Sequence, residues 1–244
     1  DVARQVQLSM LPKAISPGLN QSVITGTLRP ALEVGGDFFD FFYADSDHLC
    51  FVVGDVSDKG AASGLFMAAS KTLIKVHATR SKSPAEIVTN VNRELSLNND
   101  SCMFVTLFLG VLNLDDGRVL FTNAGHNPPM RITEPGDVSL VTDRNGHAVG
   151  VDENAEYGES SFVLGEGETF FAYTDGVTEA TNSDDEMFGE KRLVELLAFD
   201  KQPTAERAVA SVSKAVEEFE SGTQQSDDIT IIALTFLKRA VVEE

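Results

Sequence analysis

Aspartates stand at the ends of several apolar, strand-like segments, and this placement restricts how the chain can fold. Asp55 ends the run FVVGD, and Asp175 ends the run FFAYTD. Asp37 follows two glycines at the start of another such segment, and Asp227 and Asp228 open the last one. A buried carboxylate costs desolvation free energy unless something compensates it. The fold must therefore bury the apolar segments while capping, solvating or neutralising the aspartates at their ends.

The hydrophobic pattern predicts strands interrupted by two groups of helices. The predicted strands are 22–29, 37–42, 48–55, 103–114, 118–125, 129–133, 138–142, 160–164, 168–175 and 227–237. The predicted helices are 61–79, 84–95 after a capping box at Ser83, 189–198, and one that begins after Thr204. Hairpin-linked strands with helices grouped between them indicate an α+β fold, with antiparallel sheets covered by helices.

Composition excludes several classes of protein. The chain has 244 residues and a formal net charge of −19, which repels a phosphate backbone, so we expect no nucleic-acid partner. Its apolar runs are too short to span a bilayer, and we expect no secretory leader. Cys50 and Cys102 lie in apolar runs, and we expect buried thiols in a cytoplasmic, reducing compartment.

The first residues resemble the end of a helix. The chain begins at Asp1 without a methionine, so we expect a fragment of a longer protein. Val2, Val6 and Met10 are spaced to share one helix face. This face either pairs two copies of the chain or packs on the domain's own surface.

The aspartates are candidates for metal ligands. A single aspartate at a strand end is usually a cap or a turn former. Several that converge would repel one another unless cations lay between them. With no His or Cys at these positions, oxygen-only ligation favours Mg²⁺ or Mn²⁺ over zinc. Two such ions about 3.5–4 Å apart can activate a shared water for attack on phosphorus.

An ordered set of segments resembles the SpoIIE/RsbU branch of the metal-dependent (PPM) protein serine/threonine phosphatases. The resemblance covers residues 20–237, and ARQVQLSMLP before it resembles the family's linker helix. The segments are PALEVGGDFFDFF, FVVGDVSDKGAASGLFMA, TLFLGVL, FTNAGHNPP, FFAYTDGVTEA, MFGEKRL and SDDITIIAL. The resemblance implies a β-sandwich of two antiparallel sheets flanked by helices, with a two-metal centre at one end.

The resemblance also implies roles for individual residues. Asp55 matches the carboxylate that bridges both ions, and the backbone carbonyl of Val56 matches a further ligand. Asp175 and Asp227 match ligands of one ion, and Asp37 matches an aspartate that reaches the site mainly through metal-bound water. Asp228 stands where the wider family often has Asn, and we include it among the candidate ligands.

Three other residues are candidates for contact with the substrate phosphate. Arg29 lies in the region where eukaryotic members hold the phosphate. Lys59 follows Asp58 in the loop SDKG, and either approaches the phosphate or faces solvent. His126 belongs to the NAGHNPP segment, where shaping the loop by a hydrogen bond competes with acid catalysis. The basic run 71–82 either solubilises a helix face or forms part of a docking surface.

These observations predict direct, two-metal hydrolysis of phosphoserine or phosphothreonine on a regulatory protein. The branch commonly acts on STAS-type anti-sigma-factor antagonists in partner-switching circuits. A non-catalytic docking domain and a two-metal nucleotide-processing enzyme are the alternatives. We expect a linker helix in 1–19 that joins an upstream sensor, either membrane-anchored or soluble, a phosphatase domain in 20–239, and a tail in 240–244.

Overall fold

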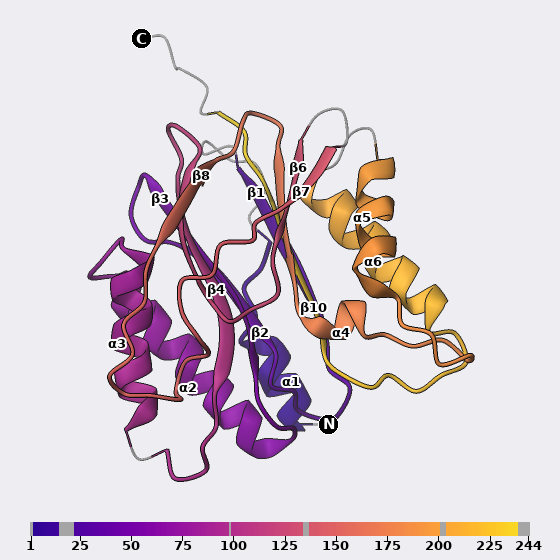
Figure 1. The fold of residues 1–244 in the computed structure, drawn as a ribbon, viewed down its shortest axis with the longest axis horizontal. Coiled ribbons are helices and arrows are strands. Elements are labelled where there is room, and N and C mark those ends of the chain that lie inside the picture. Colours follow the sequence, from indigo (N-terminus) through magenta and orange to yellow (C-terminus); the bar gives the residue numbers. More distant parts are fainter. Residues whose placement is uncertain (1, 15–21, 98, 134–136, 201–203, 239–244) are drawn as a thin grey trace.

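Two stacked β-sheets with helices on both outer faces make up the fold (Figure 1). The computed structural model describes residues 2–14, 22–97, 99–133, 137–200 and 204–238. The predicted tail 240–244, and both boundaries of the predicted phosphatase domain, fall outside these residues. The α+β sandwich that the sequence predicts is confirmed.

Each sheet has five strands, and every neighbouring pair is antiparallel. The first sheet has the order β1 (Val23–Arg29), β10 (Ile229–Thr235), β9 (Thr169–Tyr173), β6 (Met130–Thr133) and β7 (Asp137–Leu140). The second has the order β2 (Phe38–Tyr43), β3 (His48–Val56), β4 (Val105–Asn113), β5 (Arg118–Ala124) and β8 (Ser160–Val163). The chain crosses from the first sheet to the second between β1 and β2.

Aromatic side chains fill the space between the sheets. Phe51 of β3 and Phe108 of β4 lie with their ring centroids 5.1 and 5.3 Å from that of Phe170 of β9, so the two sheets meet through these rings. The alternate residues of β3, Cys50 and Val52, are buried on the outer face of their sheet. This explains why the segment 48–55 is apolar almost throughout, as expected for a strand buried on both faces.

Helices cover the two outer faces (Figure 1). The pair α2 (Ala61–Ala78) and α3 (Pro84–Ser96) packs on the second sheet, and the pair α5 (Gly189–Phe199) and α6 (Ala205–Phe219) packs on the first. Ser83 caps α3 by accepting a hydrogen bond from the Glu86 amide at 3.2 Å, as predicted. The reciprocal half of the capping box is replaced, because the Glu86 carboxylate accepts a hydrogen bond from Ser81 instead.

Two short helices lie at the same end of the sandwich: α1 (Val2–Ser9) and α4 (Asp175–Thr178) (Figure 1). The predicted N-terminal helix is thus confirmed, although its apolar stripe does not define the buried face. Val6 is 55% exposed, whereas Gln7 is 3% exposed. Among the described residues, no helix is long and apolar enough to cross a membrane.

The prediction of two buried cysteines is wrong for Cys102. Cys50 is buried, but Cys102 is exposed in a turn with a φ of 52°, and β4 begins only at Val105. The Asn99 side chain holds this turn, since its amide donates to the Met103 carbonyl at 2.6 Å and its oxygen accepts from the Met103 amide at 3.1 Å. The apolar pattern extends beyond the strand because Met103 is buried next to the turn.

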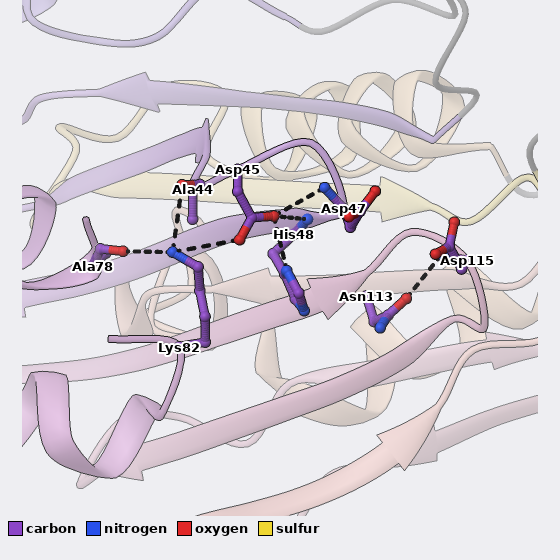
Figure 2. Close-up of polar contacts among 8 residues, drawn as sticks. All are labelled: Ala44, Asp45, Asp47, His48, Ala78, Lys82, Asn113 and Asp115. Carbon is purple, nitrogen blue, oxygen red and sulfur yellow. Dashed lines mark hydrogen bonds and ion pairs between the residues drawn. The ribbon is translucent and has the colours of Figure 1, made fainter. Parts of the chain in front are cut away.

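Two lysines of the basic run 71–82 make internal contacts, whereas Lys75 and Arg80 are exposed, so a solubilising face and a docking surface both stay predictions. Lys71 is buried and pairs with Asp40 at 3.0 Å. Lys82 donates to the carbonyls of Ala44 and Ala78 at 3.4 and 3.1 Å and lies 3.7 Å from the Asp45 carboxylate (Figure 2). These lysines therefore tie α2 and its C-terminal turn to β2 and the turn that follows it.

Candidate metal centre

Strand pairing brings the predicted aspartates together at one end of the sandwich. In the second sheet, β2 runs antiparallel to β3 with Phe38 opposite Gly54, so Asp37 and Asp55 lie at the same end. In the first sheet, Tyr173 lies opposite Ile231, so the residues after β9 meet those before β10. Asp175 and the Asp227–Asp228 pair therefore reach the same end from the other sheet.

The carboxylates at this end raise one another's pKa values. Burial, followed by the negative charges of Asp175 and Asp227, raises the pKa of Asp55 to about 7. Burial and the charge of Asp55 raise the pKa of Asp37 well above its usual range. The pKa of Asp175 is also raised, by burial and then by the charges of Glu179 and Asp227. Asp55 lies at the centre of this cluster.

Asp37 is held from three directions. Its carboxylate accepts a hydrogen bond from the Thr174 hydroxyl at 2.7 Å, and its amide donates to Asp228 Oδ2 at 3.3 Å. Its carbonyl accepts from Gln7 Nε2 at 3.4 Å. Thr174 is itself fixed, because its hydroxyl oxygen accepts from the Thr230 amide at 3.0 Å. A carboxylate restrained in this way is preorganised rather than free to rotate.

Asp227 and Asp228 have different surroundings. Asp228 is buried, and its two oxygens accept from the amides of Ala31 and Asp37 at 2.8 and 3.3 Å, so it holds the loop between β1 and β2. Asp227 is half-buried and lies 3.0 Å from Lys59 Nζ. Lys59 also donates to the Ser226 carbonyl at 2.7 Å, which places its ammonium group at the edge of the cluster.

Two glycines allow the loops of the cluster to approach closely. A Cβ on Gly176 would lie 1.9 Å from the Asp228 carbonyl oxygen, so no other residue fits there. A Cβ on Gly36 would lie 2.7 Å from the Val56 carbonyl oxygen. That carbonyl is the predicted main-chain ligand, and glycine leaves the space beside it open.

The other two candidates for phosphate contact lie in different surroundings. The Arg29 guanidinium forms an ion pair with the largely buried Glu220. His126 is buried, and burial lowers its pKa to about 4, so its imidazole is neutral at pH 7. Its Nδ1 lies 3.1 Å from the Thr106 hydroxyl, and Asn123 accepts its amide proton at 2.8 Å. These contacts favour a loop-shaping role for His126, and the phosphate roles stay predictions.

The donor chemistry of the cluster fits hard divalent cations. Its side-chain donors are carboxylates that repel one another, and cations between them would remove that repulsion. Among the described residues, no group of three Asp, Glu, His or Cys side chains is already arranged around a single ion position.

Sequence reasoning missed two residues that hold the cluster. Thr174 could have been found, because it directly precedes Asp175 at the end of an apolar strand. Gln7 gave a weaker signal: it is a polar residue beside the apolar stripe of the N-terminal helix. Its contact with the loop carrying Asp37 depends on how that helix packs against the domain.

Comparison with known proteins identifies the family. The profile of the SpoIIE family, described as stage II sporulation protein E, matches residues 45–237. This chain belongs to the SpoIIE family. The SpoIIE match and similarity to RsbU place it among the PPM-type serine/threonine phosphatases, as the sequence predicted.

Relatives of this SpoIIE-family chain differ in length. Protein IcfG of Synechocystis sp. is 31% identical over 95% of the chain, which spans 40% of IcfG. Phosphoserine phosphatase RsbU of Bacillus subtilis is 23% identical over 96% of the chain, which spans 69% of RsbU. The chain thus spans less than half of the first relative.

Solved structures show the same fold. The SiaA-PP2C domain of Pseudomonas aeruginosa is 20% identical, with a TM-score of 0.83 over 96% of this chain and 94% of that domain. RsbX in complex with magnesium is 17% identical, with a TM-score of 0.64 over 88% of this chain and 94% of RsbX.

Proposed function

We propose that the chain hydrolyses phosphoserine or phosphothreonine on a regulatory protein, using two Mn²⁺ or Mg²⁺ ions. The observation that carries the proposal is the convergence of Asp37, Asp55, Asp175 and Asp227 from both sheets, in a chain of the SpoIIE family. The magnesium complex of RsbX, which has the same fold, supports the choice of ion.

Each residue of the cluster would have its own role in binding the ions or the substrate phosphate. Asp55 would contact both ions, because it lies between Asp37 and the pair Asp175 and Asp227. The Val56 carbonyl would add a neutral donor, and Asp37 would reach the site through its hydrogen-bonded carboxylate. Bound ions supply charge stabilisation and water activation. Lys59 lies at the edge of the cluster, and it would approach the substrate phosphate once Asp227 binds a metal ion.

Metal dependence tests the reaction. Phosphate release from a phosphorylated STAS-type protein should stop in excess EDTA and return with Mn²⁺. Asp55→Asn should abolish turnover, because it removes charge from both ions. Asp137→Asn is the matched control, since Asp137 is an exposed aspartate that also begins a strand. Full activity in EDTA would refute the two-metal site, and hydrolysis of nucleoside triphosphates alone would favour a nucleotide-processing enzyme.

We further propose that affinity for the substrate comes from docking of a whole folded protein. The chain stays strongly negative even with two divalent ions bound, so it repels a free phosphate ester at long range. Binding energy away from the phosphate would position it for attack. We expect kcat/KM for a folded phosphoprotein of the STAS class to exceed greatly that for a peptide with the same phosphosite. Equal values would contradict docking.

The remaining expectations concern the longer protein. We propose that an upstream sensor continues α1, and that the exposed Val6 faces a second copy of the chain. Deleting residues 1–12 should then change the oligomeric state or the activity. An unchanged oligomeric state together with unchanged activity would count against both the sensor and the pairing of two copies. The cytoplasmic location stays a prediction.

A further inference from the structure

The N-terminal helix places one buried polar side chain against the candidate metal centre. Between Arg4 and Ser9, only Gln7 is buried, and its neighbours along the helix are exposed. Burying an amide side chain costs free energy unless both its donor and its acceptor find partners. The partners of Gln7 therefore explain why a glutamine, rather than one of the apolar residues of α1, faces the domain.

Gln7 bonds both polar groups of Gly35. Its Nε2 donates to the Gly35 carbonyl at 3.0 Å, and its Oε1 accepts from the Gly35 amide at 3.0 Å. The same Nε2 lies 3.4 Å from the Asp37 carbonyl. The side-chain amide thus pairs with the loop as a neighbouring strand would. This loop carries Asp37 and joins β1 of one sheet to β2 of the other.

Apolar packing alone does not fix the position of α1. A cavity of about 370 Å³ lies between α1 and α2, lined by Val6, Met10, Val34 and Leu65. Val6 is 55% exposed and Leu65 is 75% exposed. The apolar contact between the two helices is incomplete. Leu11, just after α1, packs against the core between the sheets, and the hydrogen bonds of Gln7 are the polar contacts that join α1 to the loop itself.

We infer that Gln7 is a positioning residue for the metal centre, acting through the loop that carries Asp37. Gly35 is in contact with Asp228 as well, because a Cβ on Gly35 would lie 2.0 Å from Asp228 Oδ2. A shift of this loop would therefore disturb Asp37 and Asp228 together. The inference rests on the proposed function, since it takes these carboxylates to act on metal ions.

The test compares Gln7→Leu with Gln5→Leu, the same chemical change at an exposed position of the same helix. In metal-free protein, the amides of residues 33–38 should exchange with solvent faster in Gln7→Leu than in wild type. Mn²⁺ affinity, measured by calorimetry, should fall about tenfold, as is typical when a supporting partner of a metal ligand is lost. Gln5→Leu should match wild type in both measurements. Gln7→Met, with an unbranched side chain, provides a second variant if Gln7→Leu unfolds.

The outcomes separate this inference from the proposed function. If wild type binds no Mn²⁺, the proposed function fails. If wild type binds Mn²⁺ and both Gln7 variants bind it within twofold of that affinity, Gln7 is not a positioning residue. Faster exchange of the loop with unchanged Mn²⁺ affinity would also overturn the inference, because Gln7 would then only attach α1.

Discussion

Replacing Asp55 by Asn should stabilise the metal-free protein at neutral pH while removing its metal site. Burial and the charges of Asp175 and Asp227 raise the pKa of Asp55 from its ordinary value of 3.8 to about 7. Between these values the native state holds a proton that the unfolded chain has released. The contribution of Asp55 to the free energy of unfolding is therefore near zero below about pH 4. It becomes steadily more unfavourable as pH rises from about 4 to 7, and it stays unfavourable above pH 7. Asparagine does not ionise, so at position 55 it makes no such pH-dependent contribution to the free energy of unfolding.

The size of the effect follows from the shift. About three pKa units, at about 1.4 kcal/mol each, set a ceiling of about 4 kcal/mol. Asp55 is partly exposed and titrates together with Asp37, so solvent screening and coupling reduce the expected difference to about 1–3 kcal/mol. The stability of Asp55→Asn relative to wild type should therefore rise by this amount between pH 4 and pH 7.5.

Urea unfolding in EDTA, at several values of pH between 4 and 7.5, measures this difference directly. Added Mn²⁺ should reverse the order at pH 7.5, because it binds wild type and not the variant. If Asp55 served only as a cap or turn former, its loss would cost about 1 kcal/mol at every pH. A destabilisation that does not depend on pH, with no response to Mn²⁺ in wild type, would refute the reasoning.

Two further substitutions test how the site and the helices are held. Thr174→Val removes the hydrogen bond to Asp37, so Mn²⁺ affinity in calorimetry should fall about tenfold. Thr122→Val, at another buried hydroxyl, should lower the melting temperature without this loss of affinity. Equal Mn²⁺ affinities in the two variants would contradict the role of Thr174. Lys71→Met leaves Asp40 buried without its partner and should cost about 3–5 kcal/mol in urea unfolding. The exposed Lys75→Met, which loses a contact of its ammonium group with the Phe42 ring, should cost only about 0.5–1 kcal/mol. A small effect at Lys71 would show that the pair is not structurally required.

The strands and helices were largely predictable because their residues repeat with clear periods. The apolar run of β3 predicts a strand buried on both faces, and Ser83 predicts the start of α3. Local pattern failed where a side chain overrides it. Cys102 lies in an apolar run that continues into β4, so the pattern predicts a buried strand residue. The Asn99 side chain instead holds a turn at Cys102 before the strand begins. Lys71 looks like one of several surface lysines, and only the packing of α2 on β2 shows that it is buried.

The candidate site was predictable as a set of residues but not as an arrangement. Aspartates at the ends of apolar strands identify it, because carboxylates there need compensation. Their convergence depends on the order of strands in two sheets, which residue spacing does not determine. The different surroundings of Asp227 and Asp228 could not be predicted either, since both precede the same strand and differ only in what their side chains meet.

The candidate metal centre lies across the seam between the two sheets, and this position links its geometry to the rest of the molecule. Asp55 belongs to one sheet, and Asp175 and Asp227 adjoin strands of the other, so the spacing of the carboxylates depends on how the sheets stack. The aromatic core around Phe170 keeps that stacking fixed. The loop with Asp37 crosses the seam, and Thr174 and Asp228 hold it from one sheet while Gln7 holds it from α1. A movement of α1 would therefore reach the site through this loop without requiring the sheets to shift.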